Sequence, residues 1–109
     1  MAPGEFVRVM NLADLREGRM KSCLIGEREI VVCNVKGEIY ALDNVCTHAL
    51  ARMSEGRLKG TRLICPMHGA AFDIRNGAVL SSPATQPLAS HAVRVIDGAI
   101  EVALQGSSS

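Results

Sequence analysis

Two short Cys-His pairs constrain this chain more than any other feature. Cys46 and His48 stand two residues apart, Cys65 and His68 stand three apart, and sixteen residues separate the pairs. Residues two apart in an extended segment direct their side chains to the same side, whereas a spacing of three requires a turn. The pairs therefore predict two loops that offer two thiolates and two imidazoles to one metal centre.

The residues around the second pair suit a tight loop. Pro66 fixes φ and has no amide hydrogen to place, and Gly69 can adopt the positive φ that close approach to a metal centre demands. We therefore expect both loops to wrap around metal-bound sulfur.

Two kinds of centre use this ligand set. A Rieske-type [2Fe-2S] cluster takes two thiolates on one iron and two imidazoles on the other. A structural zinc ion also accepts two Cys and two His, but its sites usually group the cysteines together and the histidines together. The alternating Cys-His order favours the cluster, and a zinc-stabilised binding module would instead be colourless.

The chain resembles the Rieske family, whose pattern is Cys-x-His, about sixteen or seventeen residues, and Cys-x-x-His followed by Gly. The resemblance implies that Cys46 and Cys65 bind the buried iron and that His48 and His68 bind the outer iron of one [2Fe-2S] cluster. It also implies an all-β Rieske fold, in which an antiparallel β-sandwich base carries a small inserted cluster-binding subdomain. Residues 81–87 match the family's proline loop over the cluster, although an ordinary connector is an equal alternative.

The length of 109 residues predicts a single domain over residues 1–109. We expect residues 43–80, approximately, to form the cluster-binding subdomain and residues 106–109 to be a flexible tail. Alternation of apolar and polar residues predicts strands over residues 6–10, 29–35, 38–42, 71–75, 92–96 and 100–104. Hairpin turns are expected at Lys36-Gly37, Asn76-Gly77 and Asp97-Gly98. A helical stretch over residues 12–16 is too short to organise the fold.

Composition argues against several classes of protein. The chain has no apolar run long enough to span a membrane and no signal peptide, so we expect a soluble, cytoplasmic protein. The formal charge of +1 gives no support to nucleic-acid binding. Residues 46–75 carry a net charge of +3 and the rest of the chain carries −2. This uneven distribution predicts either a weakly positive rim around the cluster or an ordinary solvated loop face.

The remaining cysteines and histidine have no ligand-like spacing. Cys23 and Cys33 lie in apolar, strand-like runs without a neighbouring His. We interpret them as reduced thiols packed as small apolar side chains, the alternative being a second metal site or a redox pair. His91 is interpreted as an ordinary strand or edge residue.

A cluster with four protein ligands has no open position for substrate, so we expect a one-electron carrier and not an enzyme. Phe6 to Leu104 is similar to the Rieske-type ferredoxins of bacterial aromatic-ring-hydroxylating dioxygenase systems, which serve aromatic hydrocarbon catabolism. The supporting segments are residues 46–48, 52–56 and 72–74. The resemblance implies a flavoprotein reductase, dependent on NADH, as electron donor and a terminal Rieske oxygenase as acceptor. The alternative is the small Rieske-like subunit of an assimilatory nitrite reductase.

The residues that accompany the ligands predict a low reduction potential. High-potential relatives place a Ser two residues and a Tyr four residues after the second ligand His, whereas this chain has Ala70 and Phe72. Respiratory relatives also join their ligand loops by a disulfide at the positions of Ala51 and Met67, which cannot form one. Without these groups the reduced cluster loses hydrogen bonds that stabilise its negative charge.

Overall fold

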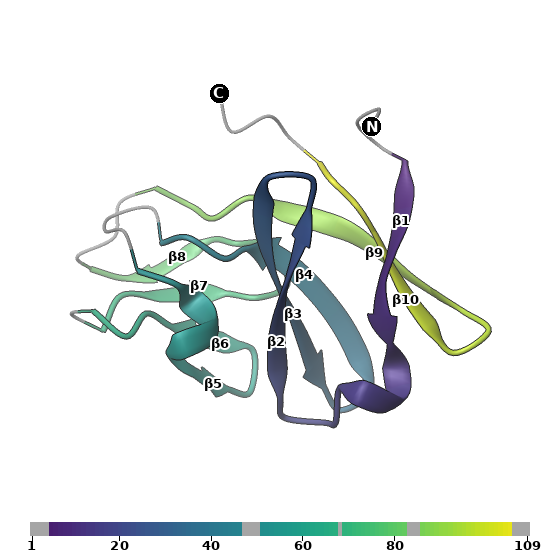
Figure 1. Cartoon of the computed structure of the whole chain (residues 1–109). Coiled ribbons are helices and arrows are strands. Elements are labelled where there is room, and N and C mark those ends of the chain that lie inside the picture. Colours follow the sequence, from purple (N-terminus) through teal and green to yellow (C-terminus); the bar gives the residue numbers. More distant parts are fainter. Residues whose placement is uncertain (1–4, 47–50, 68, 83–85, 106–109) are drawn as a thin grey trace.

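Two antiparallel sheets make up the described part of the chain, residues 5–46, 51–67, 69–82 and 86–105 of the computed structural model. The larger sheet has six strands in the order β1-β10-β9-β4-β3-β2, and the smaller has four in the order β5-β6-β7-β8 (Figure 1). The strands of the larger sheet are β1 (Phe6–Asn11), β2 (Met20–Ile25), β3 (Arg28–Val35), β4 (Glu38–Asp43), β9 (Ser90–Ile96) and β10 (Ala99–Ala103). Those of the smaller are β5 (Arg57–Lys59), β6 (Arg62–Ile64), β7 (Ala71–Asp73) and β8 (Val79–Ser81). The predicted all-β fold is confirmed.

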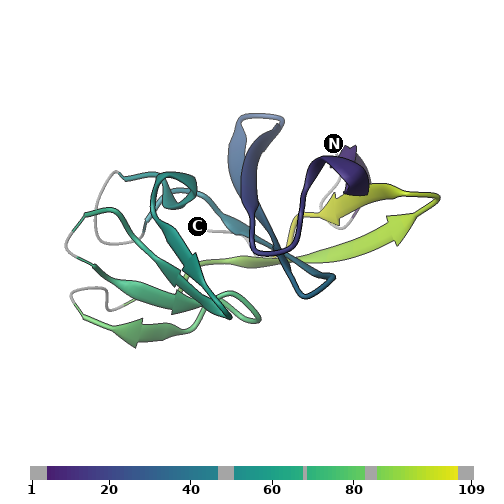
Figure 2. The same cartoon turned by 90° about the horizontal axis from the view of Figure 1, so that it is seen from below.

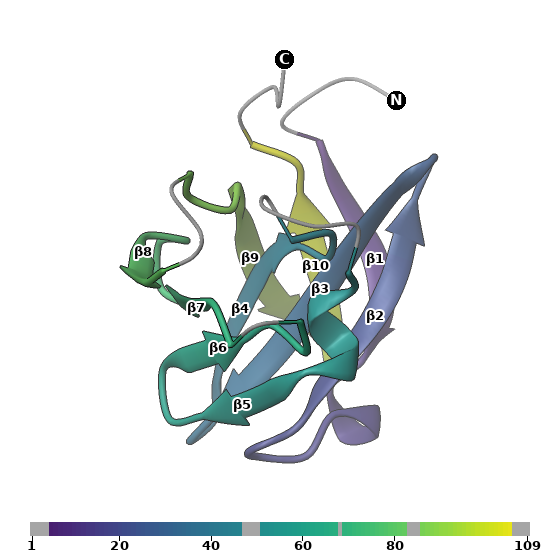
Figure 3. The same ribbon diagram turned by 90° about the vertical axis from the view of Figure 1, so that its left-hand side faces the viewer.

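The smaller sheet is an excursion from the larger one. The chain leaves the larger sheet after β4, builds β5 to β8, and returns as β9, which pairs with β4 through Ala41 and His91. Figures 2 and 3 show the smaller sheet lying beside the larger one, which curls so that its edge strands β1 and β2 come into contact. The loops at both ends of the excursion therefore start from a paired, fixed framework.

Strand β3 is buried on both faces and divides the core into two clusters. Val31 and Cys33 contribute to the cluster between the two sheets, and Ile30 and Val32 contribute to the cluster inside the larger sheet. Alternate strand residues point to opposite faces, so an uninterrupted apolar run serves both clusters. Only the cluster between the sheets contains Cys46 and Cys65.

The hairpin turns follow the prediction in two places. Lys36 and Gly37 both have positive φ, as do Asp97 and Gly98, and each pair links two strands whose register runs directly up to the turn. Positive φ at both central residues is typical of a type I′ hairpin turn. At Asn76-Gly77 only the glycine has positive φ, and the connection from β7 to β8 is longer.

Two expectations about local structure need correction. The strand predicted over residues 71–75 ends at Asp73, because the Asp73 carbonyl accepts a hydrogen bond from Gly77 and turns the chain. The helical stretch over residues 12–16 is a single 3-10 turn, η1 (Leu12–Asp14). A second 3-10 turn, η2 (Met53–Glu55), lies just after the first ligand loop. Among the described residues, no helix has the length and hydrophobicity that membrane crossing requires.

Candidate metal centre

The first predicted ligand, Cys46, lies at the base of a loop closed by backbone hydrogen bonds. Its amide donates to the carbonyl of Ala51 over 2.8 Å, and Val45 and Arg52 form an isolated antiparallel bridge just outside that bond. The side chain is 4% exposed. Residues 47–50, which include His48, lie outside the described residues.

The second ligand, Cys65, follows β6 and begins an equivalent loop. Its amide donates to the carbonyl of Ala70 over 2.7 Å, and its side chain is 2% exposed. The amide of Met67 points at the Cys65 sulfur, with 3.4 Å between nitrogen and sulfur. Gly69 has a φ of 73°, which confirms the positive φ expected for this loop. His68 lies outside the described residues.

The two predicted thiol ligands lie together although 18 residues separate them in the chain. Cys46 and Cys65 belong to the same core cluster, share a side-chain hydrogen bond, and are free of disulfides. Burial raises the pKa of the Cys65 thiol, and the neighbouring Cys46 adds to this rise against the opposing effect of the Met67 amide. The raised pKa favours the neutral form of the Cys65 thiol without metal, and bound metal would deprotonate it.

The donor set fits a Rieske cluster. Two adjacent buried thiols can take one iron, and an amide directed at sulfur, as from Met67, stabilises the negative charge that thiolates bring. Each thiol leads directly into a loop segment that contains one of the two histidines. The positions of the histidine rings belong to the part of the chain that the structure does not describe.

The stems of the first loop are held by residues without any ligand role. Asn44 is fully buried, and its side-chain oxygen accepts a hydrogen bond from the amide of Ser54 over 2.8 Å. Arg52 forms an ion pair with Glu29 of β3, with 2.7 Å between Nε and Oε1. The hydrogen bond from Arg52 lowers the pKa of Glu29, outweighing partial burial, and Asn44 adds a smaller effect in the same direction.

A partly buried group of polar side chains lies at the end of β4, immediately before the first loop. Asp43 pairs with Arg28 at 3.2 Å and with Nε2 of His91 at 2.9 Å. Burial alone would raise the pKa of the Asp43 carboxyl, but the hydrogen bonds from His91 and Arg28 outweigh it and the pKa is lowered. The interpretation of His91 as an ordinary strand or edge residue is thus wrong in part, because β9 is an inner strand and the ring is fully buried and bonded on both nitrogens.

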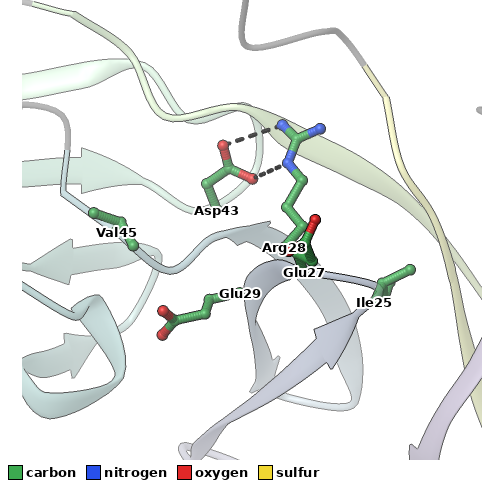
Figure 4. A pocket seen from close by; sticks show the side chains of 6 residues that line it. All are labelled: Ile25, Glu27, Arg28, Glu29, Asp43 and Val45. Atoms are coloured by element: carbon green, nitrogen blue, oxygen red, sulfur yellow. Dashed lines mark hydrogen bonds and ion pairs between the residues drawn. The ribbon is translucent and has the colours of Figure 1, made fainter.

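A shallow hollow of about 480 Å³ adjoins the chain that leads to Cys46. It lies between the β2–β3 turn and the end of β4, and Figure 4 shows Arg28 and Asp43 joined by their hydrogen bonds beside it. Its lining residues are Ile25, Glu27, Arg28, Glu29, Asp43 and Val45. None of these described lining residues carries a thiol or an imidazole.

Among the described residues, the other two cysteines do not come together in a second site. Cys33 is fully buried in the cluster between the sheets, and burial raises its pKa to about 12. Cys23 packs against the cluster inside the larger sheet, and burial raises its pKa as well. They face opposite sides of the sheet, so the expected packing as reduced thiols is confirmed.

The residues expected to set the potential lie close to the thiols. Ala70 and Phe72 are fully buried and share a core cluster with Cys46 and Cys65. Neither side chain has a hydrogen-bond donor. Met67 is 48% exposed, at the surface of the second loop. Of the proline loop expected over residues 81–87, residues 83–85 lie outside the described residues.

The charge around the loops is partly neutralised. Arg52 and Arg75 are two of the five cations within residues 46–75, and they pair with Glu29 and Asp73. Glu29 comes from outside that segment, so the local excess of positive charge is smaller than the sequence suggests.

Comparison with known proteins agrees with this geometry. A family model of the Rieske [2Fe-2S] domain matches residues 5–92. The chain belongs to the Rieske [2Fe-2S] domain family. Its Rieske domain is 37% identical over 91 residues to the ferredoxin component of the naphthalene 1,2-dioxygenase system of Pseudomonas putida, covering 84% of this chain and 88% of that protein. It is 35% identical over 99 residues to the ferredoxin CarAc of Metapseudomonas resinovorans, covering 90% and 92%.

Solved structures show the same likeness. The Rieske domain superimposes on the ferredoxin of carbazole 1,9a-dioxygenase from Nocardioides aromaticivorans IC177 with a TM-score of 0.88, at 30% identity and with 92% and 98% of the two chains covered. A complex of reduced oxygenase and oxidised ferredoxin in carbazole 1,9a-dioxygenase contains a chain that matches with a TM-score of 0.88 at 33% identity, over 95% and 99%. This Rieske protein is therefore a ferredoxin of the dioxygenase type, an electron carrier with one [2Fe-2S] cluster.

Sequence reasoning missed the polar residues that support the ligand loops of this Rieske domain. Glu29 and Asp43 sit in strand-like runs where a charged residue reads as a solvent-facing position. Asn44 has no periodic signal at all. The sequence offered one hint, the polar pair Asp43-Asn44 just before the predicted ligand Cys46. A buried loop stem needs hydrogen-bond partners for its backbone groups, and polar side chains can supply them.

Proposed function

We propose that this ferredoxin carries single electrons from an NADH-dependent flavoprotein reductase to the terminal oxygenase of a multicomponent aromatic-ring dioxygenase. The observation that carries the proposal is the contact between the buried thiols of Cys46 and Cys65 at the base of two loops, in a chain whose relatives are dioxygenase ferredoxins. An NADH-dependent donor would place the carrier in the cytoplasm.

Four side chains form the ligand set in this proposal. Cys46 and Cys65 bind one iron as thiolates, and His48 and His68 bind the other. When bound, the cluster supplies a one-electron couple. We assign its support to residues 43–80, approximately, within a single domain over residues 1–109.

The protein shields the proposed cluster from water on one side and leaves it accessible to partner proteins on the other. The core cluster around both thiols excludes water, while Pro66, Met67 and Gly69 are exposed. An electron that enters or leaves by the exposed side has the shorter path to a docked partner. We propose that this end of the molecule, including His48, His68 and Pro83, is the docking face for both partners.

In this proposal, the complexes with both partners are short-lived. Small proteins that exchange electrons with several partners use compact, weak interfaces, because release is as necessary as binding. The exposed Met67 is suited to such a surface, since its flexible thioether adapts to different partners.

The test has two stages. First, the purified protein is reduced with dithionite and examined by visible and EPR spectroscopy, where we expect a Rieske spectrum. A colourless zinc protein would refute the cluster. Second, the ferredoxin is mixed with a flavoprotein reductase, NADH and a terminal oxygenase. A ferredoxin that dithionite reduces but that supports no oxygenase turnover would refute the carrier role and leave the cluster assignment standing.

A further inference from the structure

Asn44 ties together the two ends of the first ligand loop. Its backbone amide donates to the carbonyl of Glu29 over 3.0 Å, and its carbonyl accepts from the amide of Met53 over 2.6 Å. Its side-chain oxygen accepts from the amide of Ser54 over 2.8 Å. One buried residue thus joins β3, the entry to the loop and the 3-10 turn beyond its exit.

Glu29 holds the same loop from the neighbouring strand. Its backbone carbonyl holds the entry through Asn44, and its carboxylate holds the exit through Arg52. The ion pair uses both carboxylate oxygens, with 2.7 Å from Nε to Oε1 and 3.3 Å from the second guanidinium nitrogen to Oε2. A two-bond fork fixes direction as well as distance.

The side-chain nitrogen of Asn44 belongs to the same group of polar atoms. It is buried and has no hydrogen-bond partner among the described residues. It nevertheless lies close enough to Glu29 to favour the charged carboxylate. A buried amide held in this way has little freedom to rotate, because its oxygen is already committed to Ser54.

We propose that Glu29, Arg52 and Asn44 are positioning residues that hold the first ligand loop, and with it Cys46, in the geometry that the cluster requires. The inference rests on the ligand role proposed for Cys46. Among the described residues, the Val45–Arg52 bridge and the bond from Cys46 to Ala51 lie between the stems that they hold. Loosening the stems therefore changes the iron environment and not only the free energy of unfolding.

A second ion pair provides a matched control. Arg94 and Glu101 also have 2.7 Å between Nε and Oε1, with side chains 50% and 20% exposed, against 55% and 30% for Arg52 and Glu29. They lie opposite each other on β9 and β10, strands that contribute no residue to either ligand loop. Glu101→Gln therefore removes the same kind of interaction without loosening the loop.

The experiment uses the cluster-loaded protein and compares Glu29→Gln, Arg52→Gln, the double variant and Glu101→Gln. The readouts are the EPR g values after dithionite reduction and the rate of iron loss to a chelator. We expect shifted g values and faster iron loss in both single variants and in the double variant, and neither change in Glu101→Gln. Asn44→Ala should lose iron about tenfold faster, as is usual for residues that orient metal ligands.

The double variant separates positioning from a simple charge effect. If Glu29 acts on the cluster only through its charge, neutralising Arg52 as well would cancel the effect. If the ion pair holds the loop, the double variant still lacks that contact and the effect remains. Wild-type g values and iron loss in the double variant would overturn the proposal, as would equal changes in Glu101→Gln. If Asn44→Ala does not fold, the ion-pair variants still decide. Absence of a Rieske spectrum in the wild type would instead refute the proposed function.

Discussion

His91 donates from Nε2 to Oδ1 of Asp43 over 2.9 Å. The direction of the bond follows from the other ring nitrogen, because Nδ1 accepts a hydrogen bond from the amide of Gln105 over 2.9 Å and so carries no proton. Arg28 approaches the same carboxylate from β3. Three adjacent strands, β3, β4 and β9, are therefore joined by one polar group where the chain departs for the first ligand loop.

Asp43→Asn should weaken the fold in a pH-dependent way. The lowered pKa of Asp43 means that the carboxylate stabilises the folded state above the usual Asp pKa of about 3.9, and that this contribution is lost as pH falls through the lowered value. At pH 7 we expect a loss of about 1.5 kcal/mol, the scale of hydrogen bonds to a half-exposed charge.

Urea unfolding of both proteins in the same cluster state, from neutral pH to below the usual Asp pKa, measures this difference. It should shrink as pH falls, because the protonated carboxyl loses its advantage over the amide. Asp97→Asn, in an exposed turn, is the control and should change little. A difference between Asp43→Asn and wild type that stays constant across the range would contradict the assignment.

Mutation should distinguish the two proposed ligand cysteines from the other two. Cys46→Ser and Cys65→Ser should abolish cluster retention, because each removes a thiolate from the pair at the base of the loops. Cys23→Ser and Cys33→Ala should keep the colour and iron content, since these residues belong to β2 and β3 and are not among the proposed ligands. Iron analysis and visible absorption decide; loss of iron from a folded Cys23 or Cys33 variant would show that the cysteines were assigned wrongly.

The reduction potential should lie near the lower end of the range of about −150 to +300 mV that Rieske centres span. The positions occupied by Ala70 and Phe72 are fully buried beside the thiols and provide no side-chain donor. Ala70→Ser and Phe72→Tyr should each raise the potential by roughly tens of millivolts through a new hydrogen bond to sulfur. Voltammetry measures all three proteins, and a wild-type midpoint well above zero would refute this argument.

Met67→Glu should weaken docking while leaving the cluster intact. Met67 is exposed on the second ligand loop, so a charge there enters the proposed interface, and we expect binding to the oxygenase to fall about tenfold, the scale of one apolar contact residue. Ile96→Glu changes a side chain of similar exposure, 45% against 48%, on the β9–β10 hairpin. Titration calorimetry should find that only the Met67 variant binds more weakly; equal affinity in the two variants would remove Met67 from the interface.

Gly56→Ala should be more damaging than its position in a loop suggests. A Cβ atom at Gly56 would lie 1.9 Å from the carbonyl oxygen of Ile64, directly before Cys65. Overpacking of this kind costs about 3 kcal/mol. Gly60→Ala is the control, because that site has open space and only a positive φ, worth about 1 kcal/mol. Thermal unfolding compares them; equal melting temperatures would show that the backbone at Gly56 yields readily.

The fold class could be predicted, and a ligand set could be proposed, because both depend on local pattern. The spacing of Cys46 and Cys65 from their histidines involves only neighbouring residues, and alternation along β4, β9 and β10 follows from the period of a strand. The hairpin turns at Lys36-Gly37 and Asp97-Gly98 were equally readable, since positive φ at both positions has strong residue preferences. The strands of the smaller sheet are three residues long, too short to show a period.

The polar contacts that support the ligand loops could not be predicted, because they join residues far apart in the chain. Arg52 and Glu29 are 23 positions apart, and His91 and Asp43 are 48 apart. Whether such side chains meet depends on the register of β3, β4 and β9, and a shift of one residue would turn each side chain to the opposite face. The sequence by itself supplied the proposed ligand atoms, because their spacing is local, and the pairing of the strands decided which distant polar residues meet beside the loop that carries Cys46.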